Sequence, residues 1–114
     1  MTPSPTTHHP TRSVNLRTYR PLAHQHTPEM EQALTAAAGA AVTLSFTPVL
    51  APLPRGILAT STARLAPGTS TETLQEALHA AYDHEPFVHV LPAGTWPATA
   101  ATAGSNSVHL QVAA

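Results

Sequence analysis

The sequence predicts an α+β domain in which two helices pack on a mostly antiparallel or mixed sheet. Two segments have apolar residues at helical spacing, behind clear helix-start signals. Four shorter segments have the apolar alternation that is typical of strands. The chain has 114 residues, which corresponds to one domain or to part of one. The predicted order is helix, strand, strand, helix, strand, strand.

The first 14 residues hold three prolines and almost no apolar side chains. Such a segment buries too little surface to offset its ordering entropy, so we predict a disordered leader over residues 1–14. His8 and His9 are interpreted as part of a solvated tail rather than as a metal site, because further ligands are lacking there. Residues 15–114 then form the domain.

The first helix is predicted over residues 28–38. Thr27 is placed to cap its start, Pro28 suits the first helical position, and Gly39 suits the position after its end. The preceding residues 14–23 are predicted to be extended. The apolar positions at helical spacing are Met30, Ala33, Leu34 and Ala37.

Two strands are predicted to follow this helix. Residues 42–47 alternate between apolar and hydroxyl side chains, which indicates one buried face. Residues 56–65 are predicted as the second strand. An extended loop is expected between them, because Pro48, Pro52 and Pro54 do not fit a central ladder.

The second helix is predicted over residues 69–83. Thr69 and Glu72 have the spacing of a capping box. An amphipathic stripe follows, made of Leu74, Ala77, Leu78, Ala81 and Tyr82.

The last two strands are predicted over residues 87–91 and 107–113. The loop over residues 92–105 is expected to be anchored by packing of Trp96, and a tight turn is expected at residues 104–106. The core of so small an assembly of elements is thin. An exposed apolar sheet face would therefore need a partner chain or domain.

Composition excludes several classes of function. The net charge is −1, and all five basic residues are arginines, which argues against polybasic binding of nucleic acid or membrane. Without cysteine, the chain supplies no disulfide, zinc–cysteine site or thiol nucleophile. No apolar run approaches the about 18 residues of a membrane span. No secretory signal is evident, so we predict a soluble, cytoplasmic protein.

Two places combine residue types that carry chemistry. His24 and His26 precede a predicted helix whose first turn carries Glu29, which is a candidate acid/base and anion-binding corner. The alternative is that these are ordinary polar side chains of the protein surface without a chemical role. Arg55, between Pro54 and Gly56, either pairs with a carboxylate or clamps an anionic ligand.

The other histidines of the predicted domain, His79, His84, His89 and His109, are scattered and show no metal-ligand spacing, so we interpret them as structural. The chain also has no GxGxxG, Walker A or GxSxG motif. No dinucleotide site can therefore be assigned within it.

Four blocks of sequence resemble one enzyme family. HQHTPEMEQAL (residues 24–34) is similar to the HRHTPEIEQ motif of N-acetyl-gamma-glutamyl-phosphate reductases, and FTPVLAPLPRGILAT (residues 46–60) to their FTPHLVPMPRGILAT motif. AYDHEPFVHVLPAGTWP (residues 81–97) and GSNSVHLQV (residues 104–112) resemble the next two blocks, in the same order. The likeness is greatest to the versions from high-GC actinobacteria.

The resemblance implies a partial glyceraldehyde-3-phosphate-dehydrogenase-like C-terminal domain, which serves catalysis and dimerisation in this family. The implied reaction is the NADPH-dependent reductive dephosphorylation of N-acetyl-glutamyl phosphate to the semialdehyde in arginine biosynthesis. A cysteine thiolate attacks the acyl phosphate, phosphate leaves, and hydride transfer reduces the thioester.

The resemblance also implies roles for individual residues. The catalytic histidine of the family lies in its first motif and so corresponds to the pair His24 and His26. It activates the thiolate and handles the proton on the developing hemithioacetal oxygen. Glu29 matches the motif glutamate and would orient an imidazole. Arg55 matches the arginine of the PRG motif, where we infer binding of the substrate anion.

The chain also departs from the family pattern. Gln25 stands where the motif has arginine, and neither the nucleophilic cysteine, the Rossmann domain nor the DNLxKG region is found. We therefore expect a fragment that is inactive alone. A self-associating, non-catalytic module and a gene remnant are the alternatives. The expected partners are the acyl phosphate and further copies of the chain, without nucleic acid or membrane.

Overall fold

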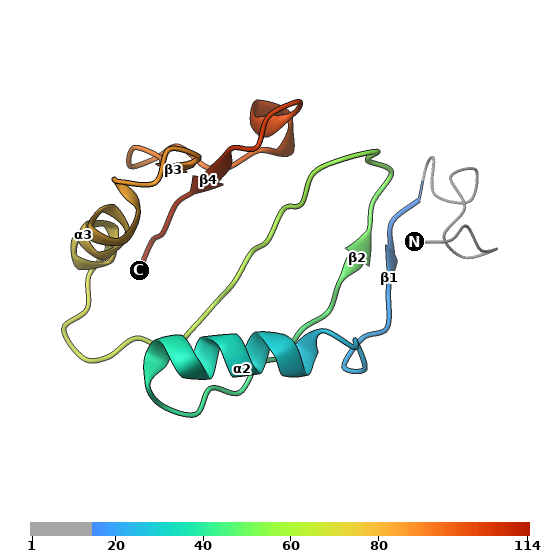
Figure 1. The fold of residues 1–114 in the computed structure, drawn as a ribbon, viewed down its shortest axis with the longest axis horizontal. Coiled ribbons are helices and arrows are strands. Elements are labelled where there is room, and N and C mark those ends of the chain that lie inside the picture. Colours follow the sequence, from blue (N-terminus) through green and yellow to red (C-terminus); the bar gives the residue numbers. More distant parts are fainter. Residues whose placement is uncertain (1–14) are drawn as a thin grey trace. The chain divides into compact units, whose positions relative to one another are not determined.

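A computed structural model describes residues 15–114 (Figure 1). The predicted leader, with His8 and His9, lies outside the described residues. The chain divides into two compact units, Met1–Pro54 and Arg55–Ala114, which are described separately. The first contains β1 (Arg17–Thr18), α2 (Thr27–Ala38) and β2 (Val49–Leu50). The second contains α3 (Thr71–Tyr82), β3 (Val88–Val90), the 3₁₀ helix η1 (Thr99–Thr102) and β4 (Val108–Leu110).

Helix α2 forms where the sequence predicted it, but its first residue differs from the predicted cap. Gly39 closes the helix in the left-handed region, at φ 65°, which a glycine adopts without steric cost. His26 occupies the N-cap position and makes no side-chain capping bond. Thr27 is the first helical residue instead, and its buried Oγ1 has no hydrogen-bond partner among the described residues. The prediction of Thr27 as the cap was therefore wrong.

The predicted strand over residues 42–47 is not a strand, although its alternation is correct. Val42, Leu44 and Phe46 are half-buried, while the residues between them are exposed. The Val42 N–H donates to Thr35 Oγ1 at 3.0 Å, and the Leu44 N–H donates to Glu31 Oε1 at 3.0 Å. Because side chains of α2 take these backbone donors, the segment runs along the helix instead of joining a ladder.

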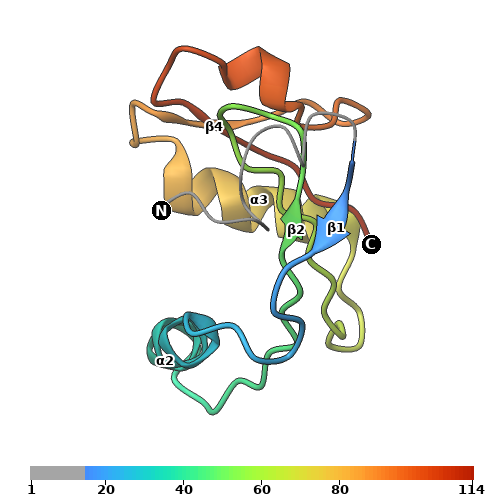
Figure 2. The same ribbon diagram turned by 90° about the vertical axis from the view of Figure 1, so that its right-hand side faces the viewer.

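In the antiparallel sheet of the first unit, β1 lies where an extended segment was predicted and β2 lies where a loop was predicted. β1 pairs with β2 in the register Arg17↔Leu50 and Thr18↔Val49, and the two strands lie side by side in Figure 2. The Tyr19 N–H donates to the Pro48 carbonyl at 2.9 Å, which extends the pairing by one bond. Prolines flank β2 without interrupting it, as an edge position allows.

Helix α3 begins one residue later than the predicted capping box. The Ser70 hydroxyl, not that of Thr69, accepts from the Thr73 N–H at 3.4 Å, and Thr73 Oγ1 accepts from the Ser70 N–H at 3.0 Å. Thr73 thus takes the role that was assigned to Glu72. The half-buried stripe of this helix consists of Thr71, Leu74, Gln75 and Leu78.

The second sheet is a parallel pair. β3 and β4 pair in the register Val88↔Val108, His89↔His109 and Val90↔Leu110. Both strands were predicted, within wider bounds, and η1 lies in the predicted loop between them. Residues 56–65 were predicted as a strand but have no ladder partner among the described residues, and Ile57 is 92% exposed.

The side-chain amide of Gln111 connects three segments of the second unit. Its Nε2 donates to the carbonyls of Leu91 (2.9 Å) and Pro92 (2.7 Å). Its Oε1 accepts from Gln75 Nε2 (3.1 Å) and from the Val112 N–H (2.8 Å). Since all donors and acceptors of this amide are used, Gln111 fixes α3 and the chain after β3 to the end of β4.

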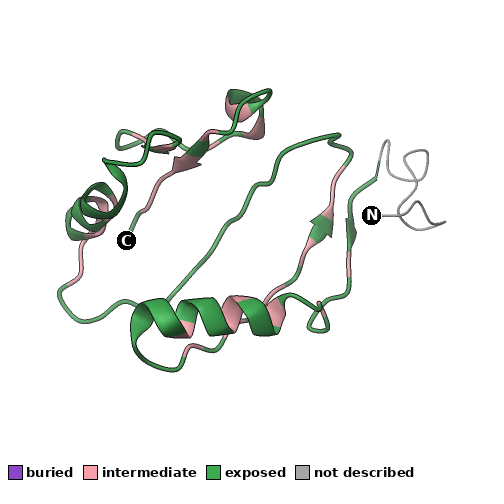
Figure 3. Cartoon of the chain, in the orientation of Figure 1, coloured by how far each residue is buried: buried purple, intermediate pink, exposed green. Residues whose placement is uncertain are grey.

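None of the residues 15–114 is fully buried, and half-buried residues lie on both helices, on β4 and along the segment that leads into β2 (Figure 3). The α+β class is confirmed, as two helices with small antiparallel and parallel sheets rather than with one continuous sheet. No helix in this range is long and apolar enough to cross a bilayer.

We expect Ser70→Ala to lower the free energy of unfolding by about 1 kcal/mol, because it removes the side-chain cap of α3. Thermal unfolding followed by circular dichroism measures the change. Thr69→Ala is the matched control, since the Thr69 N–H bonds to Ala66 through the backbone alone. Equal losses in the two variants would show that the cap does not depend on Ser70.

The same substitution should change the titration of Glu72. The hydrogen bond with Ser70, and then the backbone amide of Glu72, lower the pKa of this exposed carboxyl. Its contribution to stability is therefore present above the unfolded pKa and lost as the pH falls through the folded pKa. In Ser70→Ala the pKa of Glu72 should rise toward its ordinary value, as measured by carbon NMR of the carboxyl. An unmoved midpoint would contradict this cause.

We expect Gln111→Leu to cost about 1–3 kcal/mol in the free energy of unfolding, because the carbonyls of Leu91 and Pro92 lose their donor. Gln75→Leu removes only one of the bonds to Gln111 and should cost less. Urea unfolding of both variants provides the comparison. If the two losses were equal, Gln111 would not act as the connecting group.

Candidate functional site

The imidazole of His24 is held between two aromatic rings of the first unit. Its ring centroid lies 5.7 Å from that of Tyr19 and 5.3 Å from that of Phe46, both in edge-to-face geometry. The turn that precedes it contains two residues in the left-handed region, Arg20 (φ 46°) and Leu22 (φ 60°). This strained turn lies between β1 and α2 and leads to His24, which is half-buried in its aromatic surroundings.

A backbone hydrogen bond selects the tautomer of His24. The His26 N–H donates to His24 Nδ1 at 3.2 Å, so this nitrogen carries a lone pair. The proton of the neutral ring therefore resides on Nε2. Protonation of Nδ1 would break the bond that supports the helix start.

His26 is the more exposed of the two imidazoles. Its ring centroid lies 5.0 Å from that of His24, and Gln25 Nε2 approaches its Nε2 at 3.5 Å, a long and weak contact. Among the described residues no group bonds to its Nδ1. Its carbonyl accepts the first helical bond, from the Met30 N–H at 3.0 Å. The backbone of His26 is thus fixed in the start of the helix, while its imidazole ring is open to solvent.

The predicted anion-binding corner has few free donors. The Thr27 N–H donates to the His24 carbonyl at 3.0 Å, and the Met30 N–H is used within the helix. Pro28 has no N–H. In this turn the Glu29 N–H alone has no partner among the described residues, and it lies beside its own carboxylate, so the start of α2 is a poor cradle for an anion.

Glu29 makes no described bond to either histidine, and Arg55 belongs to the other unit. Glu29 lies exposed in the first turn of α2, and no described hydrogen bond joins it to either imidazole. Arg55 is the first residue of the second unit and is exposed. The single ion pair within residues 15–114 is His79–Asp83 at 2.8 Å, so Arg55 forms no structural ion pair there.

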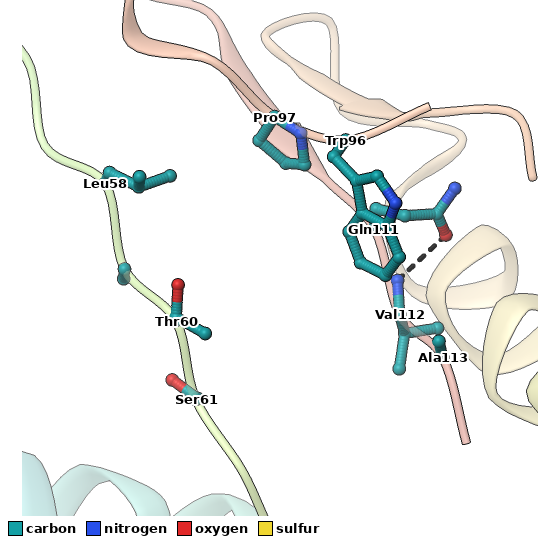
Figure 4. A pocket seen from close by; sticks show the side chains of 9 residues that line it. Leu58, Thr60, Ser61, Trp96, Pro97, Gln111, Val112 and Ala113 are labelled. Carbon is teal, nitrogen blue, oxygen red and sulfur yellow. Dashed lines mark hydrogen bonds between the residues drawn. The ribbon is translucent and has the colours of Figure 1, made fainter. Parts of the chain in front are cut away.

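The second unit contains an open hollow of about 460 Å³ beside Trp96 (Figure 4). It lies between the extended segment after Gly56 and the end of β4. Its walls are formed by Leu58, Ala59, Thr60, Ser61, Trp96, Pro97, Gln111, Val112 and Ala113. No titratable group lines it. Trp96, predicted to anchor the loop by packing, is 61% exposed on its wall, so that prediction was wrong.

The fold brings together one pair of side chains that were not predicted to be neighbours. His89 and His109 were interpreted as scattered structural histidines, yet they are direct cross-strand neighbours. The repeated pattern Val-His followed by an aliphatic residue, in both predicted strands, was the available signal. No group of three or more metal-ligating side chains exists in the described part of the chain.

The residues present do not fit NADPH. A dinucleotide site needs a glycine-rich turn that leads from a strand into a free helix N-terminus. β1 and β2 are two residues long, and the Ser70 side chain caps the start of α3. The described units therefore offer no cradle for a pyrophosphate.

The chain is similar in sequence to a group of known proteins. Residues 1–114 match the family model "semialdehyde dehydrogenase, dimerisation domain". The chain is 62% identical over 97 residues to an N-acetyl-gamma-glutamyl-phosphate reductase of Frankia casuarinae, covering 85% of this chain and 28% of that protein. It is 66% identical over 90 residues to the reductase of Acidothermus cellulolyticus, covering 79% of this chain and 26% of that protein.

The reductase of Streptomyces coelicolor gives a similar result, with 60% identity over 90 residues, 79% of this chain and 26% of that protein. The chain thus spans about a quarter of the length of the curated relatives it matches. The family match covers both described units, with the α+β elements that they contain. The chain therefore belongs to the semialdehyde dehydrogenase dimerisation-domain family.

Proposed function

We propose that the chain is the dimerisation part, with some of the catalytic groups, of an N-acetyl-gamma-glutamyl-phosphate reductase. This oxidoreductase would use NADPH to convert the acyl phosphate to its semialdehyde in arginine biosynthesis. The observation that carries the proposal is the 62% identity over 97 residues with a protein of that name. Since the chain has no cysteine and no residues that fit NADPH, both the thiolate and the hydride donor have to come from outside these 114 residues.

Within this chain we assign the acid/base role to His26. A group that exchanges protons with a reacting oxygen needs an accessible nitrogen and a pKa near the working pH, as imidazole has. His26 Nδ1 has no partner among the described residues and belongs to an exposed ring. His24 is wedged between Tyr19 and Phe46 and uses its Nδ1 to hold the His26 backbone. His24 is therefore proposed as the positioning residue.

Two further assignments belong to the same proposal. Glu29 would orient an imidazole in the assembled enzyme, and Arg55, an exposed guanidinium without a described ion pair, would bind the anionic substrate. A homo-oligomer is supported by the family's description as a dimerisation domain. A cytoplasmic location goes with a biosynthetic reaction that consumes NADPH.

A chimera tests the proposal. Residues 24–112 would replace the matching segment of the Frankia casuarinae reductase, and oxidation of NADPH by the acyl phosphate would be measured. We expect the chimera to turn over and the 114-residue chain alone to be inactive. A dimeric, folded chimera without turnover would refute the proposal.

In that chimera we expect His26→Gln to lower kcat by about 10²- to 10⁴-fold, since general acid–base catalysis contributes that much. The pH profile of kcat/KM should also lose one ionisation. His84→Gln is the control, because His84 is exposed and belongs to the second unit, outside the block of residues 24–34 that contains His24 and His26. If His24→Gln removed the ionisation and His26→Gln kept it, the two roles would be reversed.

One observation favours the second candidate, a self-associating module without catalysis. Within residues 15–114 no side chain is fully buried, and many large apolar side chains are more than half exposed. These are Leu16, Leu22, Val49, Ile57, Leu58, Phe87 and Trp96. Apolar surface of this kind marks association sites. Sedimentation that shows oligomers of the chain, together with an inactive chimera, would favour this candidate.

A further inference from the structure

The parallel pair of strands in the second unit aligns two histidines that are far apart in the sequence. His89 of β3 and His109 of β4 are direct partners in the ladder, so their side chains lie on the same face of the sheet. Their ring centroids are 5.7 Å apart, with the ring planes at 83°. Neither ring lies in the acid/base corner of the first unit.

The register that creates this pair is well fixed. Hydrogen bonds flank it on both sides, from the Val108 N–H to the Phe87 carbonyl at 2.7 Å and from the Leu91 N–H to the Leu110 carbonyl at 2.8 Å. The Gln111 amide then holds the carbonyl of Leu91 at 2.9 Å. The backbone therefore presents the two imidazoles together, without a further ordering cost for the main chain.

The ring nitrogens of this pair are available. Among the described residues no hydrogen bond engages either ring, and the two rings lie edge to face. His89 is exposed and His109 is half-buried. The neighbours in the ladder are the aliphatic residues Val88, Val90, Val108 and Leu110. The pair is thus a set of nitrogen ligands with no carboxylate in its ladder.

These features select a class of ligand. Imidazole nitrogen suits Zn²⁺, Cu²⁺ and Ni²⁺, whereas Mg²⁺ and Ca²⁺ require oxygen ligands. Since each metal–nitrogen bond is about 2.0–2.1 Å, the two nitrogens that share one ion lie within about 4 Å of each other. The ring centroids of His89 and His109 are 5.7 Å apart, so rotation of the side chains alone brings one nitrogen of each ring within this distance.

We propose that His89 and His109 form a two-point chelating site for a late first-row divalent metal ion. Water completes the coordination, and Cu²⁺ binds most tightly, as the order of divalent affinities requires. The ion binds the aligned strands and not the unfolded chain, in which the two ligands are separated by a long flexible segment. The bound ion therefore cross-links β3 and β4 and closes the loop formed by residues 91–107.

The experiment must separate this pair from the other histidines. His8 and His9 are adjacent in the sequence, and the rings of His24 and His26 are 5.0 Å apart. The starting protein is therefore the full chain without an affinity tag, with these four histidines replaced by glutamine. It is titrated with Cu²⁺ in a non-chelating buffer and followed by electron paramagnetic resonance and calorimetry.

We expect one Cu²⁺ per chain, a spectrum of two equatorial nitrogens, and a rise in the thermal midpoint of unfolding. His89→Gln and His109→Gln should each weaken binding about tenfold or more, because the second ligand no longer acts at high effective concentration. Each should also remove the thermal shift. His84→Gln, a matched exposed histidine outside the pair, should leave both quantities unchanged.

A second measurement avoids dependence on the folding of the single variants. In the starting protein, substoichiometric Cu²⁺ should broaden the imidazole NMR signals of His89 and His109 together. Broadening of only one of them, or equal binding after His109→Gln, would overturn the proposal. Binding without any thermal shift would overturn the claim that the ion requires the aligned strands.

Discussion

The side-chain amide of Gln111 is the interaction on which the second unit depends. It gives donors to the chain after β3 and accepts from α3 and from the end of β4, so a single residue joins three segments. The first unit uses the same device. The side chains of Thr35 and Glu31 in α2 accept hydrogen bonds from the backbone N–H groups of Val42 and Leu44. Where no described side chain is fully buried, directed polar bonds of this kind set the arrangement.

This explains which elements were predictable from sequence. Signals that act within one turn were sufficient: Gly39 ends α2, and Leu74 and Leu78 mark the packed side of α3. The alternation of residues 42–47 was also interpreted correctly as one-sided packing. Its partner was not predictable, because Glu31 and Leu44 are brought together only by the turn after α2. Period-two alternation reports a half-buried extended chain and does not report what its amides bond to.

The same distinction applies to the candidate site. His24, His26 and Glu29 are close in the sequence, so their proximity was predictable from the motif. The division of roles between His24 and His26 was not predictable, because it depends on Tyr19 and Phe46, which approach His24 from other segments. The pairing of His89 with His109 was not predictable from the sequence either. Parallel strands pair through a long connection whose register no local pattern encodes.

The exposed apolar side chains link the family assignment to the proposed chemistry. A first unit that leaves Leu22 80% exposed gains stability when a second surface covers such groups, because burial of apolar area is favourable. His26 sits on a helix start whose neighbours are held by few polar bonds. Under the proposed function, association would therefore stabilise the same unit that positions the acid/base group, since a partner that binds only the folded state shifts the equilibrium toward it. Proton transfer and oligomerisation would then be coupled through the stability of the first unit rather than through direct contact between the sites.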